Sequence, residues 1–205
     1  MVETGLINLD NVLWTDEATF KLNGHVNRHN CVYWSEENPN ITISREVNAP
    51  GVCCWTEISS ERIIGPFFFD ATVSKDSYLA LLKDQIEPAI AGKDLFYMHD
   101  GAPAHYAKEV RAWLDEKFSD RWIGRRGPIE WPPRSSDLTP PDFFLWGVLK
   151  EQVYAERVGT IDELRHKIIA ACAAVPVELC QKVCQSVNDR LFTCIEAGGA
   201  HTELF

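Results

Sequence analysis

The sequence predicts an α/β fold with one mixed sheet, in which an antiparallel meander joins parallel strands, flanked by helices and followed by further helices near the C-terminus. Two observations predict this class. Short apolar runs rich in β-branched and aromatic residues alternate with helical patterns. In addition, a helix ending near residue 90 is followed at once by another apolar run, as in a parallel crossover unit. With 205 residues, 45% of them hydrophobic, the chain can bury one core, and we expect residues 1–205 to form one domain.

The first half of the chain supplies the expected meander. Residues 11–15 are a short apolar run, which predicts a first strand with Asp16 near its end. Residues 32–34 indicate a further strand or a loop. Residues 52–58 and 63–69 predict two strands joined by a short polar turn, so this part of the sheet should be antiparallel.

The middle of the chain predicts the crossover. Ser74 is a suitable N-cap for a helix whose apolar residues share one face, namely Tyr78, Leu81, Leu82, Ile86 and Ile90. Residues 95–98 then predict a buried strand with Asp100 at its carboxyl end, the edge that ligand sites favour. A helix at 106–118 and a loop rich in Gly, Pro and Arg should lead to a strand at 129–131.

Three helices are expected in the last third. Asp142 stands at the start of an apolar helical pattern. Thr160 and Glu163 have the spacing of a capping box. Pro176 suits the first position of a last helix, which Gly198 and the glycine after it should end.

The formal charge of −10 argues against a surface that coats DNA generally. The segment 108–134 is the exception, with seven Lys and Arg against five Asp and Glu. Its cations could form a phosphate track with Trp122 and Trp131 as stacking surfaces; they are Lys108, Arg111, Lys117, Arg121, Arg125, Arg126 and Arg134. The alternative is a solvated helix face followed by a loop.

Other function classes are disfavoured. No apolar run approaches the roughly 20 residues that span a bilayer, and the first residues lack the pattern of a signal peptide, so we expect a soluble, non-secreted protein without a membrane partner. The seven cysteines should be free and mostly buried thiols. The helically spaced pairs Cys180/Cys184 and His25/His29 lack partner pairs at zinc-finger spacing, so structural zinc is not expected.

Three unusual segments that contain aspartates propose a site. Asp16 lies in Trp14–Phe20, Asp100 in Met98–His105, and two further acids in Ser135–Gly147. Each adjoins an apolar run, so a fold can bring them together. Clustered carboxylates repel each other, and bound cations relieve that repulsion. Mg²⁺ and Mn²⁺ prefer oxygen ligands and suit phosphate chemistry.

Each acid also has a structural alternative. Asp100 with Gly101 could form a plain turn, although a helix rather than a second strand follows. The third acid could be Asp137 or Asp142, and Thr139 with Asp142 could be a variant capping box. Strand alternation sends Asp16 and Glu17 to opposite faces, so only one of them can face the site.

These segments resemble the mariner/Tc1 superfamily of DNA transposases. Trp131–Gly147 resembles that family's Pro-rich approach to the helix bearing its third acid, with Ser136 replacing a usual proline. Asp100–His105 resembles its Asp-Gly-Ala-Pro-x-His element, and Asp16–Phe20 its Asp-Glu-Ala-Thr-Phe element. The resemblance covers nearly the whole chain and implies an RNase H-like fold with a three-acid catalytic site.

By this resemblance, Asp16, Asp100 and Asp142 are the catalytic residues and the ligands of two Mg²⁺ or Mn²⁺ ions, and no small-molecule cofactor is expected. Asp137 becomes a structural turn acid, and Glu17 a surface or salt-bridge residue. His99 and His105 could orient a ligand or contact phosphate.

The implied function is cut-and-paste transposition by a nuclear protein that binds transposon ends and target DNA, as a homodimer in the DNA complex. The family's N-terminal helix-turn-helix modules are expected to be absent, because Met1 lies only 15 residues before Asp16. One alternative is a noncatalytic transposase-derived scaffold that binds DNA or protein. Another is an RNase H-type nuclease acting on RNA:DNA hybrids, which the Pro-rich segment disfavours.

Overall fold

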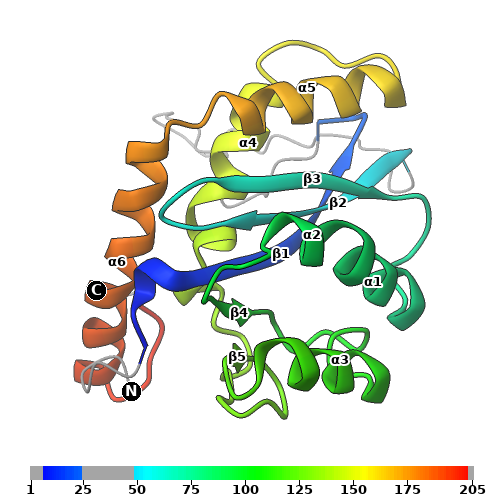
Figure 1. Cartoon of the computed structure of the whole chain (residues 1–205). Coiled ribbons are helices and arrows are strands. Elements are labelled where there is room, and N and C mark those ends of the chain that lie inside the picture. The colour runs from blue at the N-terminus through cyan, green and yellow to red at the C-terminus, as the bar shows by residue number, and fades with distance from the viewer. Residues whose placement is uncertain (1–6, 25–48, 203–205) are drawn as a thin grey trace.

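The computed structural model describes residues 7–24 and 49–202, which are arranged around one mixed sheet (Figure 1). Its strand order is β3-β2-β1-β4-β5. The strands are β1 (Val12–Lys21), β2 (Gly51–Ile58), β3 (Ile63–Phe69), β4 (Phe96–Met98) and β5 (Trp122–Ile123). β1, β2 and β3 pair antiparallel, whereas β1, β4 and β5 pair parallel. The predicted RNase H-like mixed sheet is therefore confirmed.

The central strand β1 is longer than predicted. It continues past Asp16 to Lys21 because Ala18 and Phe20 maintain the inward alternation, with 8% and 0% exposure. Asp16 pairs with Thr56 of β2. The prediction that Asp16 stands near a strand end was wrong, since it lies in the middle of the central strand.

The meander of β2 and β3 agrees with the prediction. Its register shifts between Trp55 and Glu57, where the pairing is irregular. The strand or loop predicted at 32–34 lies outside the described residues.

The last strand lies earlier in the chain than predicted. β5 is Trp122–Ile123, and Ile129 makes only an isolated parallel bridge to Ile123. Two hydrogen bonds close a turn between these two residues. The Gly127 amide donates to the Gly124 carbonyl over 3.1 Å, and the Gly124 amide donates to the Ile129 carbonyl over 3.0 Å. The strand predicted at 129–131 was therefore wrong.

One face of the sheet is covered by α1 (Lys75–Leu81), α2 (Glu87–Ala89) and α3 (Lys108–Phe118). Ser74 caps α1 as predicted, because its side chain accepts from the Ser77 amide. The predicted single helix is interrupted by a π-helical turn at Leu82–Ile86, just before Pro88, which has no backbone N–H to donate. The core on this face includes Tyr78, Leu82, Tyr97, Leu114 and Trp122.

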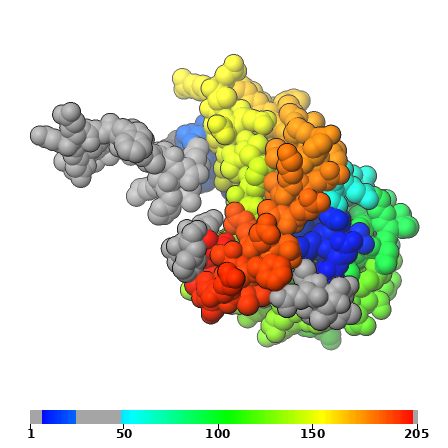
Figure 2. All heavy atoms as spheres, turned by 90° about the vertical axis from the view of Figure 1, so that its left-hand side faces the viewer, coloured from blue at the N-terminus to red at the C-terminus, as the bar shows by residue number. Residues whose placement is uncertain are grey.

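The other face is covered by a π-helical turn (Pro141–Leu145), α4 (Trp146–Val153), α5 (Ile161–Ala173) and α6 (Val177–Glu196). Their core includes Val12, Trp14, Phe20, Leu145, Leu149, Ile168 and Val187. In the space-filling view, α6 lies beside the first described residues with α4 and α5 above it (Figure 2).

The predicted helix ends are largely confirmed. The Thr160 side chain accepts from the Glu163 amide over 3.1 Å. Glu163 instead accepts from the Gly159 amide over 2.8 Å, so the capping box is not reciprocal. Pro176 is the N-cap of α6 rather than its first residue. Gly198, with a φ of 65°, follows its end.

Within the described residues, no single helix is long and apolar enough to cross a bilayer. Only α5 and α6 taken together, with a bend of 78° between them, meet that length and composition, and both bury one face in the core. The described cysteines are free thiols, as predicted, and Cys54, Cys172, Cys180 and Cys184 are buried.

Candidate active site

Asp16 is held at the centre of the sheet by a residue of α4. The indole Nε1 of Trp146 donates to Asp16 Oδ2 over 2.7 Å. Burial and the charges of Asp142 and Glu17 raise the pKa of Asp16 well above 3.8. Trp146 was not predicted as a site residue. Its position four residues after Asp142 gives both the same side of a helix, which is the signal that could have found it.

Asp142 lies in the π-helical turn that leads into α4. Its backbone amide donates to the Thr139 carbonyl over 2.9 Å. The Thr139 hydroxyl donates to the Ser135 carbonyl over 3.0 Å, and no side chain caps the turn. The capping-box alternative for Asp142 was therefore wrong, and its carboxyl group is not used as a cap.

The carboxyl group of Asp142 is electrostatically linked to both other acids. Partial burial and repulsion from Asp100 raise the pKa of Asp142 to about 6, against an opposing hydrogen bond with Asp16. Water reaches the residue and screens part of this effect. Asp142 therefore lies close enough to interact with both Asp16 and Asp100, which come from distant parts of the sequence.

Asp100 follows β4 by two residues, at the carboxyl end of the strand as predicted. Its Oδ1 accepts from the Ala102 amide over 2.9 Å and lies 2.6 Å from His105 Nδ1. The second contact is a close ion pair rather than an aligned hydrogen bond. Burial acts to raise the pKa of Asp100, but the contact with His105 outweighs it and the pKa is lowered.

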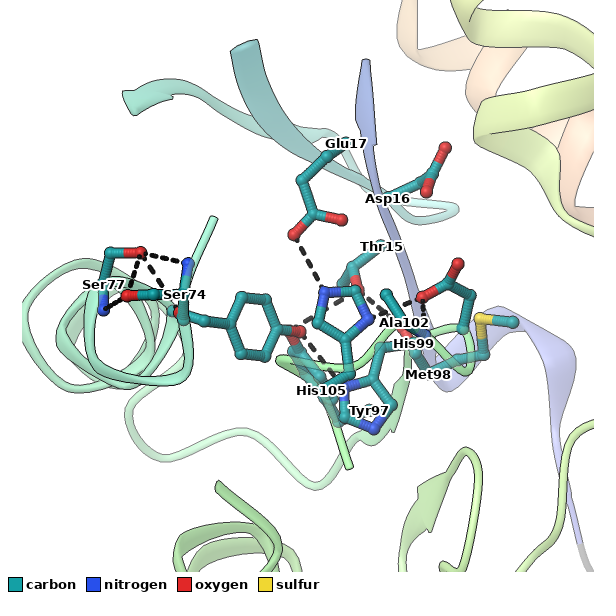
Figure 3. Close-up of polar contacts among 12 residues, drawn as sticks. Thr15, Asp16, Glu17, Ser74, Ser77, Tyr97, Met98, His99, Ala102 and His105 are labelled. Carbon is teal, nitrogen blue, oxygen red and sulfur yellow. Dashed lines mark hydrogen bonds and ion pairs between the residues drawn. The ribbon is translucent and has the colours of Figure 1, made fainter. Parts of the chain in front are cut away.

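His105 joins Asp100 to Glu17 across the sheet edge (Figure 3). Its Nε2 lies 3.1 Å from Glu17 Oε1, and its side chain is only 2% exposed. Burial acts to lower the pKa of His105, but the charges of Glu17 and Asp100 raise it to about 10. The ring is therefore an imidazolium at neutral pH, with a carboxylate at each nitrogen.

Glu17 forms the salt bridge that the sequence allowed. Its side chain is only 13% exposed, so it is not a surface residue. Asp16 and Glu17 leave β1 on opposite sides, as strand alternation requires (Figure 3). Asp16 therefore meets Trp146, whereas Glu17 meets His105.

His99 cannot contact phosphate, because its side chain is fully buried. Its Nδ1 lies 3.1 Å from the Tyr78 hydroxyl, and its ring stacks on His105 with centroids 5.0 Å apart. Burial and the charge of His105 lower the pKa of His99 well below 6.5. Of the two roles that the sequence allowed for His99, its burial excludes the phosphate contact, and the His99 ring instead packs against the His105 ring.

The chemistry of the donors fits a hard divalent cation, because carboxylate oxygens that repel one another are its usual ligands. Within the described ranges, no three His, Cys, Asp or Glu side chains are already arranged to hold a metal ion. Asp16 and Asp142 influence each other's pKa, while Asp100 Oδ1 is directed to His105 and Ala102. A cation at this site would engage all three acids only with some side-chain adjustment.

Asp137, the other candidate for the third acid, is directed elsewhere. It is 4% exposed, and its Oδ2 accepts from the Thr202 amide over 2.7 Å. Its Oδ1 lies 3.1 Å from His201 Nδ1, and its carbonyl accepts from Arg190 over 2.9 Å. The carboxyl group of Asp137 therefore anchors the C-terminal segment.

The predicted basic track is divided between two ends of β4. Lys117 pairs with Glu87 over 2.6 Å, and Arg121 pairs with Asp94, just before the strand. Asp100 lies at the opposite, carboxyl end. A single track that includes Lys117 and Arg121 was therefore wrong.

The predicted stacking tryptophans are both engaged inside the protein. Trp122 is 1% exposed and its Nε1 donates to Asp115 over 2.9 Å, so it cannot stack on a base. Trp131 is partly buried, with its ring edge against Trp14 at a centroid distance of 5.9 Å.

Five basic residues of the predicted track remain, and none of them is buried. Arg111 donates from Nε to the Tyr106 carbonyl over 3.1 Å. Arg125 and Arg126 lie over the Tyr106 ring, and Lys108 and Arg134 are exposed. No pattern in the sequence indicated the contact with Tyr106.

Comparison with known proteins places this site in a family. The model of the DDE superfamily endonucleases matches residues 11–165. The chain belongs to this family. The matched range includes Asp16, Asp100 and Asp142.

The chain is also similar to two nematode transposases. The chain is 24% identical over 200 residues to the Tc3 transposase of Caenorhabditis elegans, covering 94% of this chain and 57% of that protein. It is 25% identical over 112 residues to the Tc1 transposase of the same organism, covering 55% of this chain and 38% of that protein. The chain thus spans little more than half the length of the Tc3 transposase.

Solved structures share the fold. The Mos1 transposase paired-end complex with left transposon end has a TM-score of 0.75 at 18% identity, covering 98% of this chain and 59% of that one. The Mos1 transposase catalytic domain with Raltegravir and Mg has a TM-score of 0.68 at 17% identity, covering 97% and 89%. The DDE family member described here therefore has the fold of a mariner catalytic domain.

Proposed function

We propose that this chain is the catalytic domain of a mariner/Tc1-like cut-and-paste DNA transposase, and that Asp16, Asp100 and Asp142 bind two Mg²⁺ or Mn²⁺ ions. The observation that carries the proposal is that Asp142, in the turn before α4, lies close enough to interact with Asp16 of β1 and with Asp100 after β4. Family membership and the named relatives support it.

The chain's own residues prepare the acids for this role. Trp146 fixes one oxygen of Asp16, and His105 with the Ala102 amide fixes one oxygen of Asp100. A bound pair of divalent ions would activate a water or a DNA 3′-hydroxyl and stabilise the leaving oxygen. Because a cation lowers the pKa of a nearby carboxyl group, Asp16 and Asp142 would ionise fully on binding.

The proposed substrates are transposon-end and target DNA, and the proposed assembly is a homodimer on DNA in the nucleus. A structure of Mos1 with transposon-end DNA supports the DNA partner, because this chain shares its fold. A domain with a net charge of −10 should bind DNA weakly and in a salt-dependent manner.

The test combines metal binding with DNA cleavage. Calorimetric titration of Mn²⁺ should show binding to the wild type and loss of binding in Asp100→Asn and Asp142→Asn. Asp137→Asn is the matched control, because that carboxyl group anchors residues 201–202 rather than the site. It should retain Mn²⁺ binding in protein that is shown to be folded.

Cleavage then separates the enzyme from its alternatives. Wild type with Mn²⁺ should cut duplex DNA in preference to an RNA:DNA hybrid, and Asp100→Asn should not cut. Preference for the hybrid would indicate an RNase H-type nuclease. Failure of the wild type to bind Mn²⁺, with or without duplex DNA, would overturn the proposal in favour of a noncatalytic scaffold.

A further inference from the structure

Two adjacent arginines share one aromatic ring beside Asp100. The guanidinium carbon of Arg125 lies 4.2 Å from the centroid of the Tyr106 ring, and that of Arg126 lies 5.5 Å from it. Both arginines are exposed, and within residues 7–24 and 49–202 neither has an ion-pair partner. Among the described residues, each of the other stacked cations lies over a ring without a second arginine.

The pair lies next to the candidate active site. A Cβ added to Gly101 would lie 3.5 Å from Arg125 Cδ, so the arginine stem packs against the residue that follows Asp100. Tyr106 directly follows His105, which contacts Asp100 over 2.6 Å. One short segment, residues 100–106, therefore carries both the candidate metal ligand and the ring that holds the arginines.

The turn that carries the arginines is fixed on the buried core. A Cβ at Gly124 would lie 2.4 Å from His99 Cδ2, and a Cβ at Gly127 would lie 2.6 Å from the Trp122 ring. Glycine at both positions lets the turn rest directly on these two buried rings. Arg126 itself has a φ of 62°, in the left-handed region that few residues other than glycine adopt.

The backbone of the residue that carries the aromatic ring is held as well. Arg111, on α3, donates from Nε to the Tyr106 carbonyl over 3.1 Å. Both guanidinium groups thus lie against one ring before any ligand arrives. A planar guanidinium with free N–H groups is the side chain best matched to a phosphate, and pre-organisation reduces the entropy lost on binding.

We infer that Arg125, Arg126 and Tyr106 form an arginine clamp that holds a DNA backbone phosphate beside Asp100. The inference rests on the proposed function, and it names the residues that would hold the reacting strand. The clamp is a local cationic site on a chain of net charge −10. It would therefore contribute a large share of the chain's few phosphate contacts.

The test measures the affinity of the full chain for a labelled duplex oligonucleotide of arbitrary sequence, in Ca²⁺ and over a range of salt concentrations. The double variant Arg125→Gln with Arg126→Gln should bind at least about tenfold more weakly at low salt. The slope of log affinity against log salt should fall by about 2, one for each lost phosphate contact.

A matched control removes the same charge from the same segment. Lys117→Gln with Arg121→Gln deletes two cations that are already paired with Glu87 and Asp94 at the other end of β4. Its DNA affinity and salt slope should stay close to the wild type. Equal losses in the two double variants would mean that net charge alone matters and would overturn the clamp.

A lysine variant guards against a folding defect. Arg125→Lys with Arg126→Lys keeps both charges but lacks the planar, stacked groups, so its salt slope should persist while its affinity falls. Wild-type affinity in this variant and in the glutamine variant would also overturn the inference. If the wild type binds DNA through the clamp but never cuts it with Mn²⁺, the proposed function falls and the clamp stands.

Discussion

Trp146 donates its indole Nε1–H to Asp16 Oδ2 over 2.7 Å, and so ties α4 to the middle of the central strand. The two residues lie 130 positions apart in the sequence. Asp142, four residues before Trp146, is set by the same helical segment. This contact therefore helps to set the position of the first candidate ligand relative to the third.

Trp146→Phe should separate the hydrogen bond from the packing. Phe keeps an aromatic ring that can pack on Phe20, which contacts Trp146 at a centroid distance of 6.2 Å. We expect a loss of about 1 kcal/mol in the free energy of unfolding, because Asp16 loses a hydrogen-bond donor. The pKa of Asp16 should rise further, since this bond lowers it. Urea unfolding measures the change in stability, and the pH dependence of Mn²⁺ calorimetry reports the change in the pKa of Asp16. If both quantities are unchanged, the assigned role is contradicted.

His105→Gln should weaken Mn²⁺ binding by roughly 10- to 100-fold, as removal of a partner of a metal ligand commonly does. The reason is that Asp100 would lose the imidazolium held 2.6 Å from its Oδ1. Glu17→Gln should act in the same direction but less strongly, because His105 keeps its contact with Asp100.

His166 on α5 provides the matched control, because its side chain is exposed and far from these contacts in the sequence. His166→Gln should bind Mn²⁺ as the wild type does. In a double-mutant cycle, the effects of Glu17→Gln and His105→Gln should not add, because the two residues act through one chain of contacts. Strict additivity would show that they act separately.

Much of this arrangement could be predicted from the sequence. Apolar periodicity predicted the meander, the helix after Ser74 and the strand before Asp100, because burial of one face leaves a pattern in neighbouring residues. The resemblance in the segments around Asp16, Asp100 and Asp142 predicted which acids meet.

The errors have physical causes that local pattern does not contain. Asp16 interrupts the hydrophobic pattern inside β1, so the strand was predicted to end too early. A carboxyl group is tolerated there because Trp146 donates a hydrogen bond to it. Trp122 stands among charged residues yet is buried, because Gly124 and Gly127 let the following turn pack onto it and His99. The contact between Glu17 and His105 joins residues 88 positions apart, which no spacing rule predicts.

Glu57 should make stability depend on pH. Its side chain is 1% exposed, and burial raises the pKa of Glu57 from 4.5 to about 8, against smaller opposing effects of Ser59 and Arg62. Between these values the folded state holds a proton that the unfolded state has released. The contribution of Glu57 to the free energy of unfolding is therefore complete below pH 4.5 and is lost as the pH rises through about 8. The loss is at most about 1.4 kcal/mol per pH unit.

Glu57→Gln keeps the size of the side chain and removes the titration. Urea unfolding between about pH 5 and pH 8 should show that the variant gains stability relative to the wild type as the pH rises. The stability of Glu151→Gln, a change at an exposed position of α4, should depend on pH as that of the wild type does. Parallel curves for Glu57→Gln and the wild type would contradict an elevated pKa at Glu57.

Gly127→Ala tests how closely the turn after β5 rests on the core. The added Cβ would lie 2.6 Å from Trp122 Cζ3, which is 1% exposed and has little room to move. We expect a loss of roughly 1–3 kcal/mol in the free energy of unfolding, as for other overpacked cores.

Gly147→Ala is the matched control, because a Cβ there meets nothing within 4 Å and the site is helical, so it should gain about 0.5–1 kcal/mol. Displacement of the turn would also move Arg125 and Arg126 away from Tyr106, so DNA affinity should fall in folded Gly127→Ala and not in Gly147→Ala. Wild-type stability and DNA affinity in Gly127→Ala would show that the turn is not held by this contact.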